Sequence, residues 1–152
     1  MKRVLFLIAF ISLVVGMASC DTNPIVTEEK GVLAMVDGAS WRSGRPSAVR
    51  VSPPGRITIA AVQGGDALYL TLKPTGVGTL DLSGDDNNAS FQRSEVEYQT
   101  SLPGGSGSAT ITKFDPDRQL ISGTFSFVAV NPGNGSVTVS GGSFRDLEWA
   151  EQ

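Results

Sequence analysis

From Val32 onward the chain is a series of short runs, in which apolar residues stand together or alternate with polar ones. Glycine, proline, aspartate and asparagine break up these runs, so the pattern is typical of β-strands joined by tight turns. No stretch of this region keeps the 3.6-residue apolar period of a helix. We therefore expect an all-β domain of about 8–10 strands, either an antiparallel β-sandwich or a flattened barrel. The expected strands cover residues 32–37, 48–52, 56–63, 67–73, 78–83, 90–93, 95–100, 107–114, 120–130 and 136–144.

Turn residues predict how several of these strands pair. Gly64-Gly65-Asp66 and Asp115-Pro116-Asp117 each separate two strand patterns, and "NPGNG" at 131–135 separates a third pair. Glycine supplies the positive φ that tight hairpin turns require. We expect the last three strands to form an antiparallel meander with one polar face. The apolar phase shifts at Gly141-Gly142, which indicates a β-bulge there.

The first twenty residues have the order of an export signal. Lys2 and Arg3 precede the apolar run "VLFLIAFISLVV" at 4–15, and small residues follow it. The run is shorter than the roughly 20 apolar residues that a membrane-spanning helix needs. The segment "MASC" at 17–20 resembles the bacterial lipobox, with Met17 where leucine is usual. This resemblance implies cleavage before Cys20 and attachment of diacylglycerol, and often a third chain such as palmitate, to that residue. An ordinary cleaved secretory signal and an uncleaved anchor are the alternatives.

This interpretation divides the chain into three parts. Residues 1–19 are the signal peptide, residues 20–30 are the lipidated N-terminus and tether, and residues 31–152 are the β-domain. One acyl chain binds a membrane only marginally, whereas two or three hold a protein there stably. The predicted partner of Cys20 is therefore the membrane, and the predicted location is the bacterial cell envelope, at the outer membrane or the periplasmic face.

Composition excludes several classes of activity. The chain has no histidine and one cysteine, and Cys20 is the predicted lipid attachment point. The residues that thiol catalysis and transition-metal binding usually require, cysteine and histidine, are therefore either absent or already assigned to the lipid. The chain carries 12 Lys and Arg against 15 Asp and Glu, and no basic cluster follows residue 3. Nucleic acid is therefore not an expected partner. We expect no cofactor, no metal and no enzymatic activity.

Four groups of residues are candidate sites, and each has an ordinary structural explanation. Oxygen-rich side chains in "SGDDNNAS" at 83–90, and in "DPD" at 115–117, suit calcium but also favour turns. Glu95 and Glu97 share a strand face, where paired carboxylates can cleave glycosides or simply face water. Aromatic residues can stack on a ligand or complete the core. These aromatic candidates are Trp41, Trp149, Tyr69 and Tyr98, with a ligand role assigned to Trp41 and Trp149.

Four stretches carry a family resemblance: "AMVDGASW" at 34–41, "SATITKFD" at 108–115, "ISGTFSFVAV" at 121–130 and "GGSF" at 141–144. Together they resemble a family of bacterial lipoproteins of unknown function that is common in the Bacteroidota. The shared motifs are V-D-G-x-x-W and I-S-G-T-F-x-F. The resemblance implies the lipobox and the β architecture, and it implies no catalytic residue.

These observations favour a membrane-anchored envelope lipoprotein that acts as a non-enzymatic binding or accessory module, with a glycan or an envelope protein as its partner. The alternative is a structural or protein-interaction lipoprotein of the cell envelope. An open cleft lined by Trp or Tyr favours the first, and a large exposed apolar patch favours the second. A carrier of small hydrophobes is a variant of the first. It requires a barrel interior that Phe125, Phe127 and the leucines do not fill.

Overall fold

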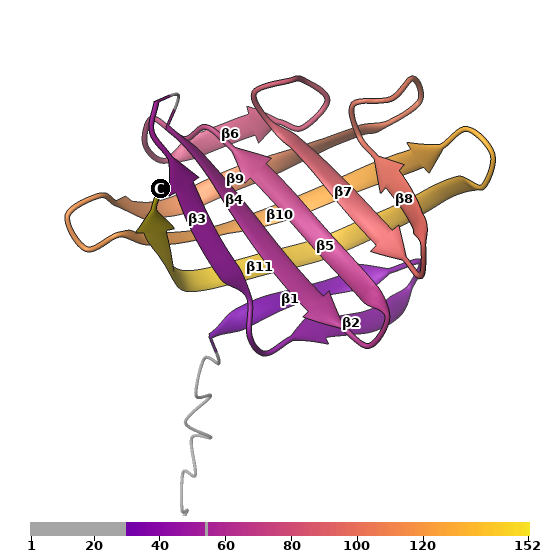
Figure 1. Ribbon diagram of the computed structural model, residues 1–152, viewed down its shortest axis with the longest axis horizontal. Helices are drawn as coiled ribbons and strands as arrows, with labels where there is room; N and C mark the ends of the chain where they lie inside the picture. The colour runs from indigo at the N-terminus through magenta and orange to yellow at the C-terminus, as the bar shows by residue number, and fades with distance from the viewer. Residues whose placement is uncertain (1–29, 54) are drawn as a thin grey trace, which may run out of the picture.

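The chain forms a sheet of eleven strands that folds over on itself into two layers, as Figure 1 shows for the computed structural model. The structure describes residues 30–53 and 55–152. The predicted signal peptide, Cys20 and all of the predicted tether except Lys30 lie outside the described residues. All regular secondary structure in the described residues is β-strand, so the all-β prediction is confirmed. None of these residues forms a helix with the length and apolar character that a membrane span requires.

The strands that cross the front of the molecule in Figure 1 form one layer, and the others lie behind them or along the lower edge. The front layer consists of β3 (Ser47–Val51), β4 (Arg56–Gln63), β5 (Asp66–Leu72), β7 (Asn88–Arg93) and β8 (Val96–Gln99). The other strands are β1 (Gly31–Val36), β2 (Ala39–Ser43), β6 (Gly78–Asp81), β9 (Ser106–Asp115), β10 (Leu120–Asn131) and β11 (Gly135–Glu151).

Strand β11 joins the two layers, because its last residues pair with a strand of the front layer. From Gly135 to Glu148 it pairs antiparallel with β10, and from Val139 to Arg145 it also pairs antiparallel with β1. Its end continues to the front layer and pairs in parallel with β3, with Trp149 opposite Ala48. On the other side, β8 meets β10 through the single pair Gln99 and Val130. The sheet thus closes on itself as a flattened barrel, antiparallel throughout apart from the β11–β3 pair.

The predicted turns are confirmed by the register of the strands. Gln63 pairs with Asp66, which leaves Gly64 and Gly65 as a two-residue turn, and β9, β10 and β11 form the expected meander. The predicted bulge is also present: β11 has one extra residue between the pairs Phe127–Val139 and Phe125–Gly142. Gly141, inside the bulge, has φ +57°, a conformation that glycine adopts without strain.

Two segments form strands that the sequence did not predict. Residues 39–43 form β2, which returns antiparallel to β1 after the two-residue turn Asp37-Gly38. Residues 145–151, which follow the last expected strand, continue β11 to Glu151. In both segments the alternation of apolar and polar residues is hard to recognise in the sequence. In β2 only Trp41 and Ser43 point inward, and one of them is polar. In β11 the inward-facing positions shift by one residue at a second irregularity before Leu147.

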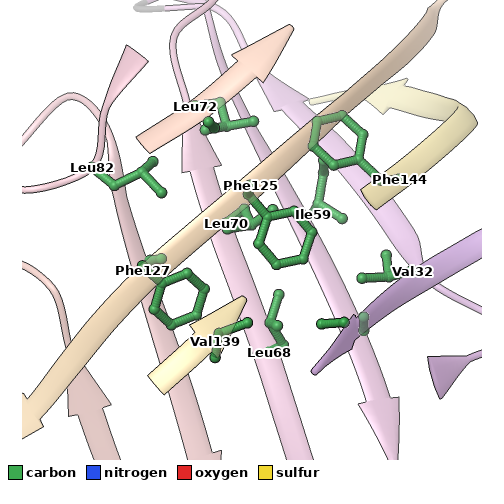
Figure 2. Close-up of a cluster of buried hydrophobic side chains, with 14 of the residues drawn as sticks. Val32, Ile59, Leu68, Leu70, Leu72, Leu82, Phe125, Phe127, Val139 and Phe144 are labelled. Carbon is green, nitrogen blue, oxygen red and sulfur yellow. The ribbon is translucent and has the colours of Figure 1, made fainter. Parts of the chain in front are cut away.

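The space between the layers is filled by large apolar side chains. Figure 2 shows the rings of Phe125, Phe127 and Phe144 lying near leucines of β5. The rings of Phe125 and Phe144 are 6.2 Å apart, and Leu68, Leu70 and Leu72 are fully buried. Burial of each such side chain contributes about 1.5–3 kcal/mol to folding. The interior of the barrel is therefore a packed core, which does not meet the condition for the carrier variant.

Candidate functional site

A hollow of about 370 Å³ is lined by residues of β1, β2, β4, β5 and β7. We call it the Trp41 hollow. The turns after β1 and β4 and the end of β7 come together at the lower right in Figure 1. Asp37-Gly38 turns the chain into β2 with φ values of +49° and +81°, a conformation that the Asp-Gly sequence favours. This turn places Trp41 on the inward face of β2. The lining includes Ser40, Trp41, Gln63, the Gly64-Gly65 turn, Asp66 and Arg93.

The Trp41 indole packs into the core but leaves its polar atom without a partner. Its ring lies 6.2 Å from the ring of Phe91 in an edge-to-face arrangement, and the residue is 6% exposed. Nε1 is buried, and no hydrogen-bond acceptor for it is found in the described part of the chain. A buried donor left without an acceptor costs about 1–3 kcal/mol. An acceptor brought by a bound molecule or an ordered water would recover this energy.

Arg93 connects the rim of the Trp41 hollow to two carboxylates. Its guanidinium lies 3.1 Å from Asp37 and 3.7 Å from Asp66, and it stands over the Phe91 ring at 5.3 Å. Asp37 is itself held in place, because its carboxylate accepts a hydrogen bond of 2.9 Å from the backbone N–H of Thr138. Arg93 and Asp66 were not predicted as site residues. They reach Trp41 only through strand register, for which a single sequence gives no signal.

Side-chain hydrogen bonds fasten the outer edge of β2 to β4 beside the Trp41 hollow. The backbone N–H of Arg42 donates to Gln63 Oε1 at 2.6 Å, and the backbone N–H of Val62 donates to Ser43 Oγ at 3.2 Å. Ser43 is a buried polar residue, so this second bond gives its oxygen a donor where water is excluded. These two bonds hold β2 against β4 next to the hollow, which Gln63 also lines.

Trp149, the second predicted ligand-binding residue, lies at a different place on β11 and has a partner for its polar atom. Its ring stacks on Phe114 at 5.5 Å and 17°, and Nε1 donates to Glu151 Oε1 at 3.1 Å. The residue is 1% exposed, although it borders a shallow hollow of about 400 Å³. Because its donor is satisfied by the protein, we assign the candidate ligand role to Trp41 alone.

The oxygen-rich loop at 83–90 uses its side chains to bind other parts of the protein. Asp86 accepts hydrogen bonds from Arg56 at 2.8 Å and Lys73 at 3.1 Å. These two bonds, first that from Arg56, hold the pKa of the Asp86 carboxyl below its ordinary value. Asn87 Oδ1 accepts the backbone N–H of Lys73 at 2.7 Å. The loop is therefore fastened to the ends of β4 and β5.

The other predicted candidates are spread over the surface and the core. Asp115 accepts the backbone N–H of Arg118 within its own turn at 3.0 Å. Glu95 lies in the turn before β8, whereas Glu97 lies on the exposed face of β8. Tyr69 is half-buried on β5 and Tyr98 is buried on β8. Among residues 30–53 and 55–152, no three His, Cys, Asp or Glu side chains gather into a group that could hold a metal ion.

A third hollow, of about 320 Å³, lies on the outer face of the β9–β10–β11 meander. Its lining is mostly small hydroxyl side chains, and Thr110 pairs in register with both Thr79 and Thr124. Thr79 and Thr110 share a hydrogen bond of 3.0 Å. This face is the predicted polar side of the meander. It lacks the buried, unpartnered donor that distinguishes the Trp41 hollow.

A family model described as a domain of unknown function, DUF6252, matches residues 29–147. The match extends from the start of β1 into the last part of β11, so it includes the Trp41 hollow and all of the buried core except Trp149. Comparison with curated proteins and with solved structures finds no match for the chain.

Proposed function

This chain belongs to the DUF6252 family of domains of unknown function, and we propose that it is a lipid-anchored, non-enzymatic binding module of the bacterial cell envelope. The observation that supports a binding role is the Trp41 hollow, because Trp41 lines it and the buried indole N–H of this residue has no acceptor among the described residues. In native proteins nearly all buried polar groups form a hydrogen bond. A buried donor without an acceptor, on a residue that lines a hollow, therefore indicates a site where a ligand can bind.

The position of the tether agrees with this role. The β-domain begins at Gly31, and the hollow lies beyond Val36, at the other end of β1. A strand of this length spans about 20 Å. Ten tether residues between Cys20 and Gly31 reach at most about 35 Å when extended. A lipid on Cys20 would therefore hold the domain close to the membrane with the Trp41 hollow away from the attachment point.

The anchor is tested by expressing the full chain and a Cys20→Ala variant in a bacterium that processes lipoproteins. We expect the wild type to partition into the detergent phase and to yield a mature chain that begins at acylated Cys20, as measured by mass spectrometry. Cys20→Ala should lose both properties, because no thiol remains for the thioether. Thr22→Ala, which changes a neighbouring residue, should behave as the wild type. An unacylated wild type would overturn the proposed anchor.

A second candidate function rests on the outer face of β1. Leu33 and Met35 are 43% and 40% exposed, and they lie on the same face because they are two residues apart in one strand. Exposed apolar side chains that adjoin one another are a feature of protein-interaction surfaces. This pair favours the alternative of a protein-interaction lipoprotein. Loss of a co-purifying envelope protein in a Leu33→Ser, Met35→Ser double variant would support that alternative.

A further inference from the structure

The charged groups at the Trp41 hollow are already paired with one another. Asp66 and Arg93, the charged residues of its lining, lie 3.7 Å apart. Arg93 is also held by Asp37 at 3.1 Å. A ligand with a net charge would have to compete with these pairs or leave one member without its partner, which is unfavourable in a partly desolvated site. The hollow therefore favours an uncharged ligand.

The remaining polar groups call for a ligand that both donates and accepts hydrogen bonds. Trp41 Nε1 can only donate, whereas the Ser40 hydroxyl donates and accepts. Gln63 uses its Oε1 to accept the Arg42 N–H, so its NH₂ group is left as a donor. Carboxylate oxygens of Asp66 add acceptors beside these donors. Hydroxyl groups on a compact ring satisfy such a mixed set.

A peptide strand does not fit this site as well. Extended peptides bind by adding a strand to a free sheet edge. Strand β2 ends the sheet at this side, but the Gln63 and Ser43 hydrogen bonds fasten its outer edge to β4. The rim of the hollow is instead the Gly64-Gly65 turn, where an added Cβ atom would meet nothing within 4 Å. Because these two glycines have no side chains, the rim of the hollow is open on this side.

We propose that the Trp41 hollow binds an uncharged sugar ring, one of whose oxygens accepts the Trp41 indole N–H. This inference rests on the proposed binding function and specifies the ligand of the same site. The volume of the Trp41 hollow, about 370 Å³, lies at the lower end of the range typical of small-molecule sites. A single ring, or the end of a longer glycan, suits this size.

The test uses the full chain purified in detergent and labelled with ¹⁵N. Its two tryptophans give two indole N–H signals, which Trp41→Phe and Trp149→Phe variants assign by their disappearance. The probes are methyl glycosides of glucose, galactose, mannose and N-acetylglucosamine. Glucuronic acid and glucosamine serve as charged counterparts. We expect a neutral glycoside to shift the Trp41 signal, to leave the Trp149 signal in place, and to bind at least about tenfold more tightly than either charged sugar.

Substitutions identify the contact within the same experiment. Trp41→Phe should weaken binding of that glycoside about tenfold, because one hydrogen bond to the ligand is lost. Trp149→Phe should leave its affinity unchanged. Tighter binding of a charged sugar would overturn the uncharged class and leave a binding module in place. Failure of every sugar to shift the Trp41 signal would overturn the sugar site itself. Neither result alters the Cys20 experiment, which tests the anchor separately.

Discussion

The two tryptophans of this chain are both buried, but the protein treats their polar edges differently. Trp149 has a stacked aromatic neighbour, Phe114, and a carboxylate acceptor, Glu151, for its N–H. Trp41 has an aromatic neighbour, Phe91, and no acceptor for its N–H in the described part of the chain. The same side chain thus completes the structure in one place and leaves an unmet hydrogen-bond requirement in the other.

This difference in hydrogen bonding distinguishes the two tryptophans more clearly than their burial does. Exposure alone would place Trp41 and Trp149 together as core residues. Hydrogen bonding distinguishes them, because the free energy lost at an orphaned donor is recovered only when an acceptor arrives. An unpartnered donor at one end of the sheet is therefore the feature that the binding proposal for Trp41 depends on.

Truncation of each ring gives the largest expected effect. Trp149→Ala should lower the free energy of unfolding by about 3–5 kcal/mol, since a buried indole, its stacking on Phe114 and its hydrogen bond are all lost. Trp41→Ala should cost at least about 1 kcal/mol less, because removal of the ring also removes the orphaned donor. Urea unfolding of both variants and the wild type measures the difference. Equal losses would show that the two indoles are equally satisfied.

Replacement by phenylalanine narrows the comparison to the N–H group. Both variants lose the same ring volume, so the difference between them isolates the hydrogen bond. We expect Trp149→Phe to be less stable than Trp41→Phe by about 1–2 kcal/mol, measured as a lower urea midpoint at an unchanged slope. If Trp41→Phe is the less stable variant, then Nε1 of Trp41 already has an acceptor, such as an ordered water. The proposed difference between the two tryptophans would then be wrong.

The strands with the strongest alternation were predictable from the sequence, as were their turns. The β4–β5 hairpin has regular apolar spacing and a Gly-Gly turn, and its register agrees with both. The two tryptophans lie in the segments that were missed. The Asp37-Gly38 turn was a signal for β2, because Asp-Gly is a strong hairpin sequence, but "ASWRS" after it has too few apolar residues to suggest a strand.

The candidate site was less predictable than the fold, for a physical reason. Trp41, Asp66 and Arg93 come from three strands that are not neighbours in sequence, and only the completed register brings them together. The end of β11 poses a similar problem. Its parallel pairing with β3 joins residues about a hundred positions apart, and nothing local in "RDLEWAEQ" specifies that partner.

The smallest expected effect is a pH dependence of the folding stability near Trp149. It arises at Asp146, in the irregularity of β11 just before that tryptophan. Asp146, with φ +43°, accepts a hydrogen bond of 2.7 Å from Lys113 Nζ, and its backbone N–H donates to Ser122 Oγ. The Lys113 bond, more than any other contact, holds the pKa of the Asp146 carboxyl below its ordinary value. Asp146 therefore stabilises the folded chain above about pH 4, and this contribution is lost as the pH falls through the lowered pKa.

Substitution of Asp146 by asparagine tests this contribution, because asparagine tolerates the same positive φ. Unfolding free energies of the wild type and Asp146→Asn should differ at pH 6 and converge toward pH 3. Asp117→Asn, in the exposed turn between β9 and β10, is the matched control and should run parallel to the wild type. The effect should be modest, since the Lys113 and Asp146 side chains are 44% and 41% exposed and water screens their attraction. A difference in unfolding free energy that stays constant from pH 6 to pH 3 would mean that Asp146 acts through backbone geometry. The charge of Asp146 would then not help to stabilise the end of β11 that carries Trp149.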